Sequence, residues 1–205
     1  MKKIIFGFLI LLIGSTTFAL DTKDYITAAY SYGLFTERAN NMETQIASNG
    51  FDFSAATYFN ENWGMYSNLS LFFGSKATIS SGGYSLTIPN ENWASVFFSG
   101  IIGATYNYVI NEQFELFGGF GIHFAYHVFA VQTGENIFSM QYGLGGDIGI
   151  RYLINKTFYL TGGSLLSHVF FAHVEKEDSY GNTTTENGFY NFGSIRLYIG
   201  IGITY

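Results

Sequence analysis

The chain has 205 residues, of which 12% are charged and 20% aromatic, with 25 glycines, one proline, no cysteine and a formal net charge of −6. A soluble domain usually carries about 25% charged residues, so this composition suits strands that face lipid on one side. The lack of cysteine excludes disulfides, and the negative charge argues against nucleic acid as a partner.

The first segment has the layout of an export signal. A positive start precedes the apolar run Ile4–Ile13, and Thr17 and Ala19 occupy the small-residue positions of a cleavage site. The run is shorter than the roughly 20 residues of a transmembrane helix, and no cysteine follows it that could carry a lipid anchor. We therefore expect residues 1–19 to be a signal peptide and residues 20–205 to be one domain. No later stretch suits a transmembrane helix, so a membrane-spanning mature chain must form a closed β-barrel.

A weak internal repeat marks three turns, at residues 59–63, 110–114 and 154–158. Each copy has an apolar residue, an Asn, two polar residues and an aromatic residue. Asn suits tight turns, and the flanks are rich in β-branched and aromatic residues, so each copy predicts a short hairpin turn. The longer polar stretches are expected to be loops at the opposite end: Thr36–Asn49, Ser75–Asn92, Val131–Asn136 and Glu175–Gly188.

Three short turns and four loops predict eight strands in an antiparallel up-and-down transmembrane β-barrel, with both chain ends at the short-turn side. The expected strands are 25–35, 51–59, 63–74, 93–110, 114–130, 138–154, 158–174 and 189–205. Several exceed the roughly 9–11 residues that cross a bilayer, so they should project beyond it.

Alternation along these strands separates an apolar face from a polar one. Counted by twos from the turns, the outward faces of the second, fourth, fifth and sixth strands hold no Asp, Glu, Lys or Arg. The opposite, inward faces hold Asp52, Glu115, His123, His127, Asp147 and Arg151. A Lys or Arg at the lipid midplane costs about 2–4 kcal/mol, so this segregation is what a barrel requires.

The seventh strand fits this pattern poorly. Its outward set includes Ser164 and His168, while Leu165 and Val169 fall on the inward set. A β-bulge would switch the faces partway along the strand. The sequence does not fix its position.

The last strand carries a family resemblance. It alternates apolar residues with small or polar ones and ends on an aromatic residue, and the apolar set is Leu197, Ile199, Ile201, Ile203 and Tyr205. This end resembles the C-terminal signature of bacterial outer-membrane proteins, although Phe is commoner than Tyr in the final position. With the turns and the export signal, the mature chain resembles the OmpA/OmpX/OmpW-type small barrels. The resemblance implies an integral protein of the bacterial outer membrane with both termini periplasmic, in contact with outer-membrane lipids. It also implies that the barrel-assembly machinery reads the C-terminal residues.

Eight strands leave an interior just wide enough for side chains. Glu115 should pair with Arg151 on the neighbouring strand, and Arg196 should find a carboxylate, which we expect to be Asp147. Buried charges must be paired to exist, so a structural network is favoured over an ion path.

The sequence gives only a weak indication of catalytic or metal-binding residues. His123 and His127 lie about 13 Å apart along one strand, too far for both to bind one metal directly. Ser167 and His168 are adjacent in a strand and face opposite ways, so His168 cannot activate Ser167 without a bulge. We therefore expect that the protein is not an enzyme and that it binds no cofactor and no metal.

Three functions remain open. The favoured one is a structural or surface-interaction barrel with a largely plugged lumen, whose acidic loops meet an extracellular ligand that the sequence does not specify. The second is a narrow channel for small or hydrophobic solutes, as proposed for the OmpW-like group. The third is a lipid-modifying enzyme.

Overall fold

The computed structural model describes residues 23–39, 42–132 and 134–205, so the expected signal peptide lies outside the described residues. The strands are β1 (Asp24–Ala39), β2 (Met42–Tyr58), β3 (Trp63–Ser81), β4 (Tyr84–Pro89), β5 (Trp93–Val109), β6 (Phe114–Val131), β7 (Asn136–Leu153), β8 (Phe158–Glu177) and β9 (Thr183–Thr204). A short 3-10 turn, η1 (Asn90–Asn92), joins β4 to β5. No helix in the described ranges is long and apolar enough to cross a membrane.

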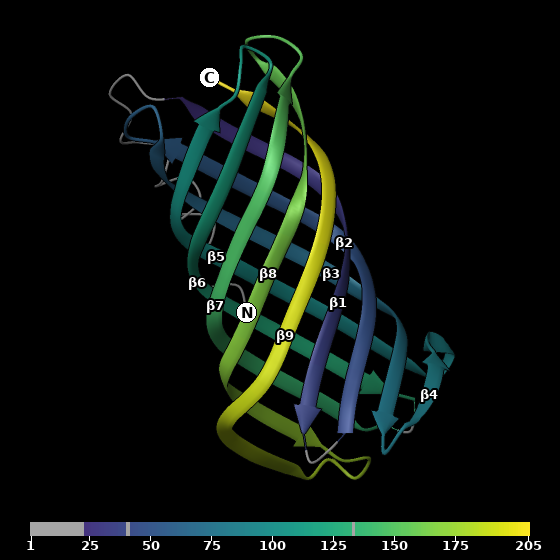
Figure 1. The fold of residues 1–205 in the computed structure, drawn as a ribbon. Coiled ribbons are helices and arrows are strands. Elements are labelled where there is room, and N and C mark those ends of the chain that lie inside the picture. The colour runs from purple at the N-terminus through teal and green to yellow at the C-terminus, as the bar shows by residue number, and fades with distance from the viewer. Residues whose placement is uncertain (1–22, 40–41, 133) are drawn as a thin grey trace.

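Eight of these strands form a closed antiparallel ring in the order β1-β2-β3-β5-β6-β7-β8-β9, as predicted. The ring closes where β9 pairs with β1, from Tyr25 opposite Thr204 to Arg38 opposite Asn191. The tilted strands enclose an elongated barrel (Figure 1). Within the described ranges β4 pairs with β3 alone, so it forms a hairpin outside the ring.

The three predicted turns are confirmed, and each is held by its Asn side chain. Asn60 Oδ1 accepts hydrogen bonds from the backbone N–H groups two and three residues later, at 3.0 and 2.8 Å. Asn111 and Asn155 make the same pair of bonds at 2.8–2.9 Å. The Asn side chain thus accepts hydrogen bonds from the backbone groups of its own turn. This explains why each repeat has two residues between the Asn and the aromatic residue. At the same end Asp24 and Tyr205 exchange backbone hydrogen bonds of 3.1 and 3.2 Å.

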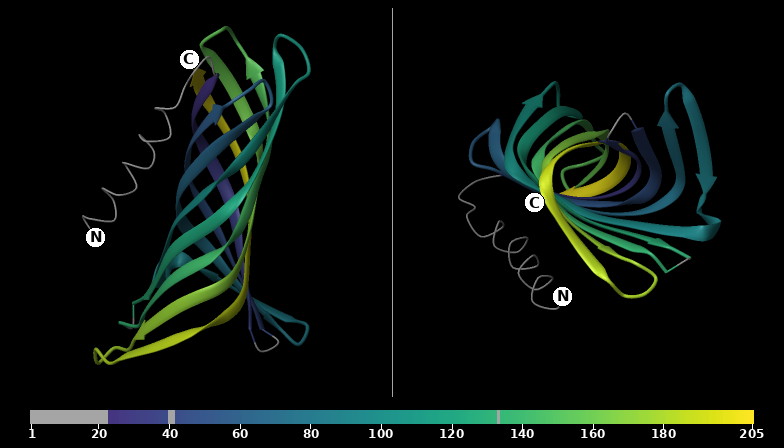
Figure 2. Two further views of the ribbon diagram at one scale, coloured as in Figure 1. Left: turned by 90° about the vertical axis from the view of Figure 1, so that its left-hand side faces the viewer. Right: turned by 90° about the horizontal axis from the view of Figure 1, so that it is seen from below.

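Three of the four predicted loops are wrong, because most of their residues are in strands. Residues 36–39 and 42–49 extend β1 and β2, residues 175–177 and 183–188 extend β8 and β9, and residues 75–81 and 84–89 form the β3–β4 hairpin. Polar composition indicated loops, but a strand outside lipid can be polar on both faces. Cross-strand hydroxyl pairs support the β3–β4 hairpin, at 3.3 Å for Thr78–Thr87 and 2.8 Å for Ser80–Ser85. The hairpins splay apart at the end opposite the short turns (Figure 2). The short β6–β7 connection is as predicted.

A bulge is present in the seventh strand of the ring, β8, at Phe170, but it lies beyond Ser164, Leu165, His168 and Val169, so the expected switch of the faces of these residues does not occur. Val169 lies opposite Gly143 and Phe171 lies opposite Tyr142, which leaves Phe170 without a β7 partner in the pairing. Both Phe170 and Phe171 are exposed, whereas Val169 is buried in the interior. The alternation of inward and outward side chains is therefore regular up to Val169. Leu165 is buried in the interior, as counting by twos from the turn indicates. A second bulge interrupts the pairing of β2 with β3 between Ala47 and Ser48.

Candidate functional site in the barrel interior

The interior near the short turns is organised around Glu115 of β6, which is 2% exposed. Its carboxylate accepts hydrogen bonds of 2.6 Å from Lys23 Nζ and from the Tyr25 hydroxyl. Arg151 Nη1 lies 3.8 Å from Glu115 Oε2, so the structure brings together the two residues that we expected to pair. Two hydrogen-bond donors and a nearby guanidinium therefore compensate the charge of this buried carboxylate.

Arg151 itself fills the centre of this layer. Its guanidinium carbon lies 4.0 Å from the ring centroids of both Tyr25 and Phe117, so the cation is held between two aromatic faces. Arg151 Nη1 also donates to Asn107 Oδ1 at 3.1 Å. Outside this layer, at the short-turn end, an open bowl of about 660 Å³ is lined by Lys23, Tyr25, Tyr58, Asn107 and Glu115, among other residues.

The prediction that Arg196 pairs with Asp147 is wrong. Arg196 Nη1 lies 3.6 Å from Asp52 Oδ1 of β2, and Arg196 is fully buried. It also donates to Ser70 Oγ at 2.6 Å and Ser99 Oγ at 3.1 Å. In the closed ring β2 and β7 each lie two strands from β9, and the Arg196 side chain points to the β2 side, where Ser70 of β3 and Ser99 of β5 also accept its hydrogen bonds. The order of strands along the chain hides this proximity, because β2 comes near β9 only when the ring closes.

Asp52 completes this central layer. Its carboxylate accepts hydrogen bonds from the hydroxyls of Ser31 and Ser70, which come from the strands on either side. Alternation placed Asp52 on the inward face, but nothing in the sequence identified its partner. The buried ion pair therefore joins the second and the last strands of the ring.

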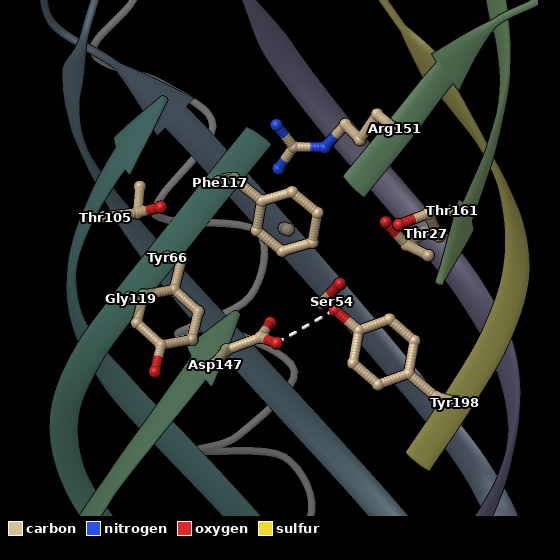
Figure 3. A pocket seen from close by; sticks show the side chains of 12 residues that line it. Thr27, Ser54, Tyr66, Thr105, Phe117, Gly119, Asp147, Arg151, Thr161 and Tyr198 are labelled. Carbon is tan, nitrogen blue, oxygen red and sulfur yellow. Dashed lines mark hydrogen bonds between the residues drawn. The ribbon is translucent and has the colours of Figure 1, made fainter. Parts of the chain in front are cut away.

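Asp147 is instead bound to Tyr198, whose hydroxyl donates to it at 2.8 Å. Figure 3 shows these two side chains facing a small cavity together with Tyr66, Phe117 and Arg151. The cavity has a volume of about 20 Å³, which is room for about one water molecule. The space between the two charged layers is therefore mostly filled by protein.

Toward the hairpins the interior becomes apolar. One buried cluster consists of Phe35, Ile46, Phe72, Ala77, Trp93, Phe97, Val169 and Phe192. Phe97 stacks between Phe35 and His127, with ring centroids 4.0 and 3.7 Å away. His127 Nε2 is also 2.9 Å from Ser95 Oγ. These rings lie across the lumen at the level where the ring of strands ends and the hairpins begin.

The candidate metal-binding and catalytic residues of the sequence do not come together in a site. His123 is buried in the polar part of the interior, while His127 belongs to the aromatic stack. Ser167 points inward and hydrogen-bonds Ser194 at 2.7 Å, and His168 is exposed on the outer face. Ser167 and His168 therefore do not form a nucleophile–base pair.

The C-terminal residues alternate as the sequence indicates. Leu197, Ile199, Ile201, Ile203 and Tyr205 are exposed on the outer wall. Arg196 and Thr204 are buried on the inner side. The last strand thus supplies both an apolar outer surface and a central cation.

No protein-family model matches the sequence, and no curated protein matches it. Solved structures do resemble the fold. The outer membrane protein OprG from Pseudomonas aeruginosa superposes with a TM-score of 0.63 at 10% identity, over 89% of this chain and 95% of OprG. Neisserial surface protein A gives 0.57 at 14% identity, over 88% and 96% of the two chains. Ail of Yersinia pestis, solved with a heparin analogue, gives 0.54 at 13% identity, over 91% and 100%. The chain therefore has the fold of the small bacterial outer-membrane β-barrels, as the sequence resemblance implied.

Proposed function

We propose that this chain is an integral outer-membrane protein that acts through its surface, as a structural and interaction barrel whose lumen is closed by its own side chains. The observation that supports closure is the succession of filled layers along the interior. The Glu115–Arg151 layer, the Asp52–Arg196 layer and the aromatic cluster around Phe97 follow one another from the short turns to the hairpins. An eight-stranded barrel leaves little space beyond this.

The interacting surface that we propose is the group of projecting hairpins. Tyr84 is 85% exposed and Tyr180 is 90% exposed, and both lie at hairpin tips. The β8–β9 tip is ordered by Asp178, whose Oδ1 accepts the N–H groups of Tyr180 and Asn182 at 2.9 and 2.8 Å. The Asn182 side-chain amide, which donates to Asp178 Oδ2 at 2.8 Å, together with these backbone N–H groups, holds the pKa of Asp178 below its usual value. A hairpin tip that is held by hydrogen bonds and presents an exposed aromatic ring suits contact with another macromolecule.

The charge of this surface restricts the partner. Glu175, Glu177, Asp178 and Glu186 lie on the β8–β9 hairpin, with Lys176 paired to Glu186 at 3.1 Å. A polyanion such as the heparin analogue bound to Ail would be repelled here. We therefore do not propose a ligand of that kind for this chain. A neutral or cationic partner fits better.

The closed lumen is tested by conductance. We expect purified, refolded protein to show no steady conductance in planar lipid bilayers, because the charged and aromatic layers leave no continuous water path. The narrow channel is the alternative, and the bowl of about 660 Å³ at the short-turn end is the feature that favours it. Steady wild-type conductance whose ion selectivity changes in Arg196→Ala, without loss of stability, would replace our proposal by that channel.

The proposed location and orientation need a separate measurement. We expect mature protein in the outer-membrane fraction to begin near Leu20, by N-terminal sequencing. The chain has no cysteine, so single cysteines report on sidedness. Tyr180→Cys at a hairpin tip should react with a membrane-impermeant maleimide on intact cells, and Lys156→Cys in a short turn should react only after lysis. The reverse pattern would invert the orientation.

We also propose that the protein is not an enzyme. The Ser167 hydroxyl faces the interior and His168 faces outward, so this pair offers no activated nucleophile. Hydrolysis of outer-membrane lipids by the purified protein, abolished in Ser167→Ala, would contradict this.

A further inference from the structure

The β8–β9 hairpin leaves the ring with one open strand edge. The pairing of β9 with β1 ends at Asn191, opposite Arg38. Beyond this point residues 183–189 of β9 pair with β8, and among the described residues no second strand pairs with them. The bulge at Phe170 lies where the hairpin leaves the ring, and a bulge bends its strand. The hairpin accordingly projects away from the barrel (Figure 2).

The tip of the hairpin determines which backbone groups of β9 face this open edge. The N–H group of Asp178 donates to the carbonyl oxygen of Asn182 at 3.0 Å. Because hydrogen-bonded and non-hydrogen-bonded pairs alternate along an antiparallel ladder, Thr184 and Glu186 bond to β8. The residues that point their N–H and C=O groups away from β8 are Thr183, Thr185, Asn187 and Phe189. The open edge therefore presents a row of backbone donors and acceptors with which an added strand can pair.

The outer edge of β4 is less suited to such pairing. A two-glycine turn joins β3 to β4 after Ser81, so Ser85, Thr87 and Pro89 are the residues whose backbone groups point away from β3. Pro89 has no N–H group to donate, and β4 has only six residues. Pro89 is the only proline of the chain, and the β9 edge contains three consecutive threonines, which favour an extended strand. The β9 edge is therefore the better place for strand addition.

The side chains beside the open edge favour a cationic partner. Thr183 and Thr185 lie opposite Glu177 and Glu175 of β8, so the two carboxylates share one face of the hairpin with these threonines. Adjacent strands are about 4.8 Å apart, so a Lys or Arg on an added strand can reach over the short threonine side chains to the carboxylates. Residues 171–189 contain four carboxylates and a single lysine. A second copy of the chain would bring a second acidic edge, so pairing between two copies is disfavoured.

We propose that the open edge of β9 binds an extended cationic segment of another protein by strand addition, antiparallel to β9, with Lys or Arg side chains over Thr183 and Thr185. The inference rests on the proposed function and deepens it, since it assigns a backbone conformation and a charge to the partner of the hairpins. Backbone hydrogen bonds supply affinity in this mode of recognition, and alternate side chains supply specificity. The bound segment therefore carries basic residues at every second position, where they meet Glu175 and Glu177.

The probe is a synthetic peptide that alternates Lys with Thr and is as long as the open edge, titrated into refolded protein in neutral detergent. Two isomers of equal charge carry backbone N-methyl groups on the lysines or on the threonines. In antiparallel addition the lysines lie opposite Thr183, Thr185 and Asn187 and donate their backbone N–H groups to β9. We expect lysine methylation to weaken binding about tenfold or more, and threonine methylation to change it less than about twofold. Equal affinities of the two isomers, or loss in the threonine isomer instead, would overturn the proposal.

Two proline variants test the edge from the side of the protein. Thr185→Pro removes an outward N–H group from β9 and no hydrogen bond to β8, and Thr87→Pro makes the matched change on β4. We expect Thr185→Pro to weaken binding of the unmethylated peptide about tenfold and Thr87→Pro to leave it unchanged. Glu177→Gln should also weaken binding, whereas Glu91→Gln removes a carboxylate from η1 and should not. A shift in electrophoretic mobility on heating establishes that the variants fold. Equal binding by the two proline variants would contradict strand addition at β9.

A different occupant of the edge would be recognised by mass. Native mass spectrometry should show wild-type protein as a monomer, and a dimer that Thr185→Pro dissociates would assign the edge to a second copy and overturn the proposal. Conductance and maleimide labelling test the closed lumen and the orientation by themselves. If they gave the expected results and the peptides did not bind, strand addition would be wrong while the proposed function stood.

Discussion

Arginine in place of Ile148 is expected to destabilise the folded barrel by about 2–4 kcal/mol, the cost of a cation on the lipid-facing surface near the bilayer midplane. Ile148 lies on β7 between the exposed residues Tyr142 and Tyr152 and is 64% exposed on the outer wall. Folding into lipid vesicles, followed by urea titration, measures the free energy of unfolding.

Leu86→Arg is the matched control for Ile148→Arg. Leu86 is 63% exposed, but it lies on β4, in a hairpin outside the ring. A surface substitution in water changes stability by less than about 0.5 kcal/mol. Equal losses at the two positions would show that Ile148 does not face lipid. An inward glycine is not a suitable control, since a Cβ at Gly145 would lie 2.5 Å from Ile101 Cδ1.

Arg196→Met is expected to cost about 3–5 kcal/mol, because it leaves the buried Asp52 carboxylate without its cation. Arg196 is fully buried and lies 3.6 Å from Asp52. If water entered the central layer freely, the stranded carboxylate would be solvated and the loss would be much smaller. The size of the loss therefore reports on the dryness of the lumen, independently of conductance.

Two further variants separate the ion pair from general damage. Asp52→Leu combined with Arg196→Met should recover most of the lost stability, since replacing a whole buried pair by apolar residues is often neutral. Lys176→Ala removes a pair with Glu186 that is exposed to solvent, and should cost less than about 1 kcal/mol. A double variant no more stable than Arg196→Met alone would show that the single loss comes from packing.

The strand ring and the turns could be predicted because their signals are local. Asn60, Asn111 and Asn155 act on backbone groups two and three residues away, and alternation by twos needs no knowledge of the partner strand. The hairpin extensions could not be predicted, because polar strands outside lipid lack the alternation that identifies a strand.

The interior contacts were predictable only in part. Glu115 and Arg151 are direct cross-strand neighbours, so their proximity follows from the register of one hairpin. Arg196 and Asp52 meet across the lumen, and their proximity depends on how the whole ring closes. Tyr25 of β1 and Lys23, which precedes β1, also reach Glu115, and no sequence pattern marks them as its partners.

The central ion pair makes completion of the barrel a condition for burying Asp52. Asp52 and its hydroxyl partners Ser31 and Ser70 come from the first three strands, and the cation comes from the last one. In a barrel without β9 in place, the Asp52 carboxylate would lack its cation and would have to be hydrated or protonated. A dry centre therefore requires that β9 is paired with β1 and that Arg196 is in place, whatever the order in which the strands insert. Burial of Asp52 thus depends on the position of Arg196 in the closed ring. A barrel without β9 in place is expected to be less stable and more permeable to water than the complete one.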